Sequence, residues 1–150
     1  MATTVGTEGD TKQLLKNLIQ LEHDAIAAYD AVIAKLVDAR RAEKVRSFRE
    51  DHQSHLDALS DLARKHHAYD PGQGSMKSML TTGKVNVAAM AGSDSALLKA
   101  MSTNETDTVT AYRRALENRD APDAARSFLQ DALADEERHK SWMDTEADRA

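Results

Sequence analysis

Residues 125–143 read ARSFLQDALADEERHKSWM, and this stretch combines a helical pattern with a polar interruption of it. Its apolar residues recur at steps of three and four, which keeps their side chains on one face of an α-helix. Glu136 and His139 lie on that same face. A buried carboxylate is costly unless its charge is compensated, and a bound cation suits a carboxylate beside a neutral imidazole. The stretch therefore predicts a core helix that takes part in a metal site.

The composition of the 150-residue chain is typical of a helical protein with one domain and a sizeable core. Charged residues make up 30% of it, and it has only two prolines and six glycines. Because there is no cysteine, disulfides, thiol catalysis and thiolate metal sites are excluded. The formal charge of −5 argues against nonspecific binding to nucleic acid or to anionic membranes.

The sequence shows no pattern of a membrane or export segment. No apolar run approaches the roughly 20 residues of a membrane span. Residues 1–10 lack the basic and apolar parts of a signal peptide. We therefore expect a cytoplasmic protein with no membrane partner, and we expect residues 1–10 to be disordered.

Four segments with helical spacing predict the fold. The expected helices span about residues 11–38, 42–66, 94–118 and 121–147. The strongest breaker in the chain, YDPGQG at residues 69–74, opens a crossover over about residues 67–93. This crossover is apolar enough to predict either a short helix across the bundle or a surface for a partner. The predicted fold is all-α: one domain, residues 11–147, built as an antiparallel four-helix bundle with one long crossover between helices 2 and 3.

Polar residues interrupt each of the four helical faces near the middle of the helix. They are Glu22, His52, His55, Glu105, Glu136 and His139. In an antiparallel hairpin, two residues lie level when the turn is midway between them. The midpoint between Glu22 and His52 falls next to the first expected turn. The midpoint between Glu105 and Glu136 falls at the second, so we expect all six side chains at one height of the bundle.

The second half of the chain also repeats the polar residues of the first half. A shift of 83 or 84 residues relates Glu22 to Glu105, Tyr29 to Tyr112, Asp51 to Asp135, His52 to Glu136, and His55 to His139. A metal site with pseudo-twofold symmetry requires a repeat of this kind.

These residues resemble the ligand set of the ferritin-like dinuclear iron or manganese carboxylate proteins, and the chain looks most like small bacterial ferritin-like domains of unassigned function. In that group a Glu comes from each of two helices and a Glu-x-x-His from each of the other two. Glu22 and Glu105 match the single glutamates, and the segment Glu136–His139 matches one Glu-x-x-His. The segment His52–His55 supplies the second histidine but has imidazole in place of the bridging carboxylate. The resemblance covers residues 11–147.

The resemblance implies a core site for two iron ions, with manganese or zinc as alternatives. It further implies that ferrous iron is oxidised with dioxygen or peroxide, which is a ferroxidase or peroxide-reducing activity. Three glutamates leave two divalent ions with about one uncompensated positive charge. Either an extra bridging anion completes the site or one of the two positions is weak. The alternative function is a noncatalytic metal-binding bundle with a structural or stress-related role.

Other residues are expected to support these ligands. We expect Asp51 and Asp135 to accept hydrogen bonds from the histidines across the bundle, with direct ligation by Asp51 as an alternative. We expect Tyr29 and Tyr112 to lie about one turn from the site and to donate hydrogen bonds. A homodimer through the crossover or an outer helix face is a further expectation.

Overall fold

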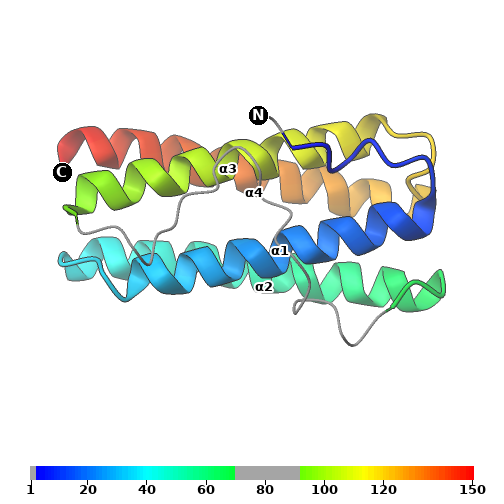
Figure 1. The fold of residues 1–150 in the computed structure, drawn as a ribbon, viewed down its shortest axis with the longest axis horizontal. Helices are drawn as coiled ribbons and strands as arrows, with labels where there is room; N and C mark the ends of the chain where they lie inside the picture. Colours follow the sequence, from blue (N-terminus) through cyan, green and yellow to red (C-terminus); the bar gives the residue numbers. More distant parts are fainter. Residues whose placement is uncertain (1–2, 70–91) are drawn as a thin grey trace.

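The computed structural model describes residues 3–69 and 92–150, and these residues form four long helices. The helices are α1 (Thr11–Ile33), α2 (Ala39–Lys65), α3 (Asp94–Glu117) and α4 (Arg126–Arg149), with a short 3₁₀ turn, η2 (Asp123–Ala125), before α4. They pack side by side as a bundle without strands in the described residues (Figure 1). The predicted all-α four-helix fold is thereby confirmed.

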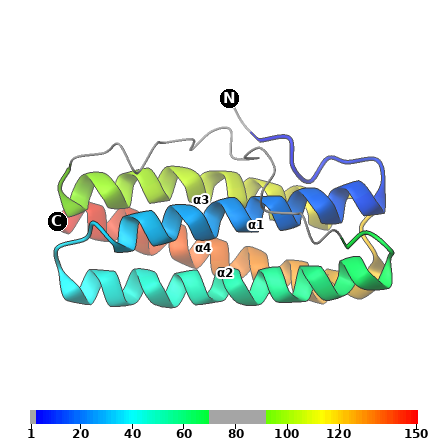
Figure 2. The same ribbon diagram turned by 60° about the horizontal axis from the view of Figure 1, so that its bottom comes forward.

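The two helix pairs, α1 with α2 and α3 with α4, are antiparallel, whereas α2 and α3 run in the same direction (Figures 1 and 2). The start of α3 is therefore next to the α1–α2 turn. There the carboxylate of Asp94 accepts hydrogen bonds from the backbone N–H groups of Val37 (2.9 Å) and Asp38 (3.1 Å). The predicted crossover with its short helix falls mainly on residues 70–91, which lie outside the described residues.

Three helix ends, the end of α1 and the starts of α2 and α4, differ from their predicted positions. The helix α1 ends at Ile33, and Asp38 instead caps α2 by accepting hydrogen bonds from two backbone N–H groups of its first turn (2.8 and 3.2 Å). The helix α4 begins at Arg126 rather than near residue 121. The reason is local, because Pro122 has an extended ψ of 138° and the 3₁₀ turn follows it.

The segment before α1 is packed, which differs from the disorder that was predicted for residues 1–10. Within residues 3–10, Val5 is fully buried. Gly6 has a φ of +102°, and a Cβ atom there would meet the backbone of α3 at 2.6 Å. Its carbonyl accepts a hydrogen bond from the side-chain amide of Asn118 (2.9 Å). Glycine is thus required for the close approach of this segment to α3.

The apolar core of the described residues consists of two clusters. The first includes Leu15, Leu18, Leu59, Leu62 and Leu129, and the second includes Val45, Phe48, Leu98, Met101 and Met143. Along α2, α3 and α4, the polar residues predicted for the site lie between the residues of the two clusters. The site is therefore closed off by apolar side chains at both ends. No helix in the described residues has the length and hydrophobicity that a membrane crossing requires.

Candidate metal centre

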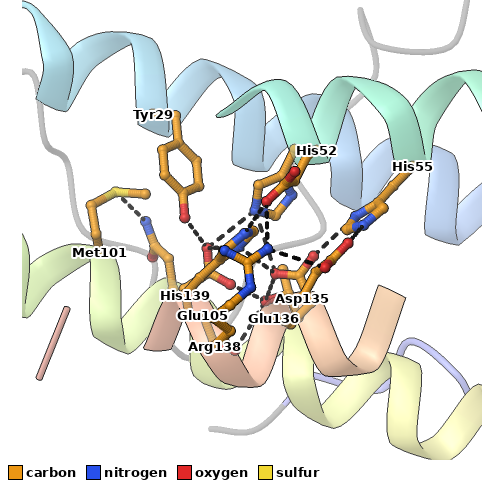
Figure 3. Close-up of polar contacts among 12 residues, drawn as sticks. Tyr29, His52, His55, Met101, Glu105, Asp135, Glu136, Arg138 and His139 are labelled. Carbon is orange, nitrogen blue, oxygen red and sulfur yellow. Dashed lines mark hydrogen bonds and ion pairs between the residues drawn. The ribbon is translucent and has the colours of Figure 1, made fainter. Parts of the chain in front are cut away.

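The six residues that the sequence singled out lie together in the middle of the bundle, and none is more than 4% exposed. They form two overlapping groups of potential ligands. One is Glu22, His52, His55 and Glu136, and the other is His52, Glu105, Glu136 and His139. Within each group one ligand atom of every residue lies within 4.8 Å of the others. Figure 3 shows α2 and α4 directing their imidazoles and carboxylates toward the same point.

Helical spacing explains how two ligands come from each of α2 and α4. Residues three apart face the same side of a helix, so His52 and His55 point together into the bundle, as do Glu136 and His139. The helices α1 and α3 each contribute one carboxylate at the same level. The arrangement is therefore a direct consequence of the interrupted apolar faces in the sequence.

The outer nitrogens of two histidines are held by aspartates across the bundle. The Nε2 of His55 bonds to Asp135 (2.8 Å), and the Nε2 of His139 bonds to Asp51 (2.8 Å). The imidazoles are the donors because ionised carboxylates only accept. In a neutral imidazole, this leaves the Nδ1 lone pair free to bind a metal. Each Nδ1 faces the interior of the bundle. This is the orientation expected if the aspartates position the imidazoles to bind a metal there.

The two buried tyrosines make equivalent contacts between α1 and α3. The hydroxyl of Tyr29 donates to Glu105 Oε1 (2.5 Å), and the hydroxyl of Tyr112 donates to Glu22 Oε1 (2.6 Å). Burial and the charges of the neighbouring glutamates raise the pKa of both tyrosines well above 10. Both therefore remain protonated and hold the carboxylates in place.

His52 lies between the carboxylates of α1 and α3. Its Nδ1 is 2.7 Å from Glu22 Oε2, and its Nε2 is 3.2 Å from Glu105 Oε1 and 3.4 Å from Glu136 Oε2. Burial acts to lower the pKa of His52, but the charges of these three glutamates outweigh it and raise that pKa well above 6.5. His52 can therefore donate from both ring nitrogens, as an imidazolium that links two carboxylates.

The remaining groups show how the charges of the cluster are balanced. Burial acts to raise the pKa of Glu22, but the charge of His52, its hydrogen bond and the charge of His55 outweigh burial and lower the pKa to about 2. Burial acts to lower the pKa of His55, but Glu136 and Glu22 outweigh it and raise the pKa to about 10. Burial and the charge of Glu105 raise the pKa of Glu136. Protons thus balance the carboxylates, and a divalent cation would have to displace them.

Unsatisfied buried atoms provide a test of whether the cluster fits a cation. Among the described residues, the buried side-chain atoms that make no hydrogen bond are His55 Nδ1, Glu136 Oε1, His139 Nδ1 and Asn104 Oδ1. Three of these belong to the cluster. Buried polar atoms normally have partners, so such a concentration calls for an explanation. Carboxylate oxygens together with imidazole nitrogens suit iron, manganese and zinc. The cluster could therefore hold a metal.

Thr108 is a polar neighbour of the cluster that the sequence did not single out. Its hydroxyl lies 2.8 Å from Glu105 Oε2 and 3.0 Å from Glu136 Oε2. A hydroxyl has one proton and can donate to only one of these oxygens at a time. Its position on the buried face of α3, one turn after Glu105, could have indicated a contact with the site. A threonine at that position is also compatible with ordinary packing, so the sequence alone did not distinguish the two.

Arg138 is a second such residue, at the surface above the histidines. Its Nη2 donates to Asp51 (2.8 Å) and to Asp135 (3.1 Å), the two aspartates that hold His139 and His55. Figure 3 shows its guanidinium beside Asp135. Arg138 therefore links the supports of both histidines.

A comparison with known protein families matches residues 10–118 to the family described as Domain of unknown function (DUF2383). The chain belongs to the DUF2383 family. DUF2383 domains are of the ferritin-like type, which agrees with the four-helix bundle. The DUF2383 match includes α1, α2 and α3, whereas Glu136 and His139 on α4 lie beyond it. No curated protein matches the chain.

Proposed function

We propose that this protein is a metal-binding ferritin-like protein whose core site holds two iron or manganese ions and oxidises ferrous iron with dioxygen or peroxide. The observation that carries the proposal is the group of three unsatisfied buried atoms within a cluster of carboxylates and imidazoles. Burying three carboxylates and three imidazoles is costly for packing alone, and a divalent cation would compensate the carboxylates and bind the Nδ1 atoms.

In this proposal the glutamates neutralise the metal charge and the histidines bind through Nδ1. Glu22 and Glu105 each serve one position, and Glu136 lies within reach of both. His55 and His139 are the nitrogen ligands that their aspartates already orient. Ferrous ions held by these residues would supply the electrons that reduce dioxygen or peroxide, one from each ion.

The protein itself contributes orientation and exclusion of water. Tyr29 and Tyr112 keep their protons and hold Glu105 and Glu22 in fixed positions. The two apolar clusters close the bundle above and below the site. A dry, preorganised site strengthens the interaction between carboxylates and cation.

The second candidate is a metal-binding bundle without catalysis, for example one that holds zinc. The position of His52 favours it, because this imidazole takes up hydrogen-bonding capacity of both Glu22 and Glu105. A neutral imidazole bridges two ions far less readily than a carboxylate does. One tightly held ion would then stabilise the fold without turnover.

Aerobic addition of ferrous iron to the metal-free protein separates the two candidates. We expect rapid dioxygen uptake and a near-ultraviolet ferric absorbance, both lost in Glu136→Gln. Glu137→Gln, which changes the exposed neighbour, is the matched control and should react like the wild type. Tight zinc binding together with iron oxidation no faster than in buffer would reject the catalytic proposal and support the second candidate.

A further inference from the structure

The two groups of ligands differ in how far their atoms are already engaged within the protein. We call Glu22, His55 and Glu136 the first lobe, and Glu105, His139 and Glu136 the second lobe. His52 adjoins both, and Glu136 offers Oε1 to the first lobe and Oε2 to the second. If both lobes were equivalent, as the internal repeat suggests, their distances and hydrogen bonds would match. They do not.

The first lobe has its ligand atoms close together and largely free. His55 Nδ1 lies 3.1 Å from Glu136 Oε1 and 3.5 Å from Glu22 Oε1. Ligand atoms bound to one cation at about 2.1 Å lie about 3.0 to 3.4 Å apart, so this spacing is suitable before any ion binds. His55 Nδ1 and Glu136 Oε1 face each other as an ion pair, and apart from this contact neither atom makes a hydrogen bond among the described residues. Glu22 Oε1 accepts one hydrogen bond, from Tyr112, and keeps a second lone pair.

The second lobe is wider, and its oxygens are engaged. His139 Nδ1 lies 3.6 Å from Glu136 Oε2 and 3.9 Å from Glu105 Oε1. Glu105 Oε1 faces two donors, the hydroxyl of Tyr29 and Nε2 of His52. The hydroxyl of Thr108 donates either to the other oxygen of Glu105 or to Oε2 of Glu136. A cation entering this lobe must displace hydrogen bonds that the first lobe does not have.

Thr108 is also where the two halves of the chain differ in sequence. The shift of 83 residues that relates Glu105 to Glu22 relates Thr108 to Ala25, which has no hydroxyl. Ala25 is buried at the corresponding place on α1. The first lobe therefore has no hydroxyl donor that corresponds to Thr108 in the second lobe.

We infer that the two metal positions are unequal: the first cation binds to Glu22, His55 and Glu136, and the second lobe fills only at higher metal concentration. This inference rests on the proposed metal-binding function. Its physical basis is that the ligand atoms of the first lobe already lie closer together, and accept fewer hydrogen bonds, than those of the second lobe. The second lobe is held back by Thr108 and by the contact of His52 with Glu105 Oε1, whereas in the first lobe His52 bonds to the other oxygen of Glu22, Oε2 (2.7 Å).

A titration of the metal-free protein with Co²⁺ under anaerobic conditions tests this order, followed by calorimetry and by visible absorption. For the wild type we expect one tight phase per chain and a second phase at least roughly tenfold weaker, because hydrogen bonds to carboxylates must be released. His55→Ala should weaken the tight phase roughly 100-fold or more, since removing a ligand should exceed the effect of removing a ligand's partner. His139→Ala, its counterpart in the repeat, should leave the tight phase within about threefold of wild type and remove the weak one.

Milder variants keep the test decisive if a histidine variant does not fold. Asp135→Asn weakens the support of His55 and should reduce tight-phase affinity about 10- to 100-fold, whereas Asp51→Asn should not change it. Thr108→Val keeps the side-chain shape but removes the donor, so it should strengthen the weak phase and leave the tight phase unchanged. Circular dichroism confirms the fold of each variant.

The outcomes separate this inference from the proposed function. Loss of the tight phase in His139→Ala or Asp51→Asn, or two phases of equal affinity in the wild type, would overturn the order while leaving metal binding intact. Absence of any Co²⁺ binding to the wild type would overturn the metal-binding proposal together with the order.

Discussion

The helix pairs α1–α2 and α3–α4 carry equivalent polar residues, yet the site that they build is not symmetric. Each pair supplies one tyrosine, one single glutamate, one aspartate and one histidine that is bonded to the aspartate of the other pair. The contacts are reciprocal, because the aspartates of α2 and α4 hold the histidines of the opposite helix. The tyrosines of α1 and α3 likewise donate to the opposite glutamates. Neither pair can therefore complete the site alone.

The difference between the pairs lies at the centre of the site. His52 stands where the repeat has Glu136, and Ala25 stands where it has Thr108. The supporting layer of tyrosines and aspartates keeps the symmetry, whereas the groups that would lie between two ions have lost it. The supporting tyrosines and aspartates can therefore stay the same in both halves while the residues at the bridging positions, His52 and Glu136, differ.

The largest difference between the two helix pairs is expected in the metal-dependent stability of Glu22→Gln and Glu105→Gln. Bound metal stabilises a fold by about 4 kcal/mol at a thousandfold excess over Kd. We expect Glu22→Gln to lose most of this stabilisation and Glu105→Gln to keep most of it, because only the first belongs to the preformed lobe. Urea unfolding with and without Co²⁺ measures the difference, with the exposed Glu43→Gln as control. Equal losses would mean that the halves are equivalent in binding.

The next largest effect on stability and metal binding is expected at His52, which stands where the repeat has the carboxylate of Glu136. His52→Glu places a fourth carboxylate in the cluster and removes the imidazole between Glu22 and Glu105. We expect the metal-free protein to lose about 3 kcal/mol of unfolding free energy, as when one partner of a buried ion pair is removed. Metal should restore the stability, and the second position should bind metal more tightly than it does in the wild type. Ser54→Glu, which adds the same charge on the exposed side of α2, should change neither property. An unchanged affinity of the second metal-binding phase in His52→Glu would show that His52 does not limit the second position.

The tyrosines provide a smaller and more symmetric comparison. Tyr29→Phe and Tyr112→Phe each remove a buried hydrogen bond to a carboxylate, which should cost about 1.5 to 3 kcal/mol. The two losses should agree within about 0.5 kcal/mol if the supporting layer is equivalent. Chemical denaturation measures both, with the half-exposed Tyr69→Phe as the control. A loss in only one variant would extend the asymmetry beyond the bridging positions.

The smallest effect on stability is expected at Arg138, which links α2 and α4 at the surface through Asp51 and Asp135. Arg138→Gln removes the link between Asp51 and Asp135, but the Arg138 side chain is 51% exposed, so the loss in stability should be about 1 kcal/mol or less. Arg113→Gln, at an exposed pair with Glu137, is the matched control. Unfolding of both variants in high and low salt measures the difference. A loss of several kcal/mol in Arg138→Gln would show that the aspartates need this link to hold the histidines.

Much of the site could be read from spacing alone. The three- and four-residue steps place Glu136 with His139 on one helical face, and the midpoint of each hairpin sets the height of the opposite residues. The helix ends were less accurate, because the cap at Asp38 and the 3₁₀ turn after Pro122 depend on local backbone geometry. The packing of Val5 could not be predicted, since a single apolar residue has no periodicity.

The amino-acid sequence by itself determined which side chains share a height in the bundle, because periodicity and chain reversal depend only on residue order. The tertiary structure decided which atoms meet. The contacts of Thr108 with two carboxylates, the unsatisfied Nδ1 atoms, and the 3.1 Å approach of His55 to Glu136 depend on the rotation of each helix about its axis. That rotation is set by the packing of all four helices together, which no single helix encodes.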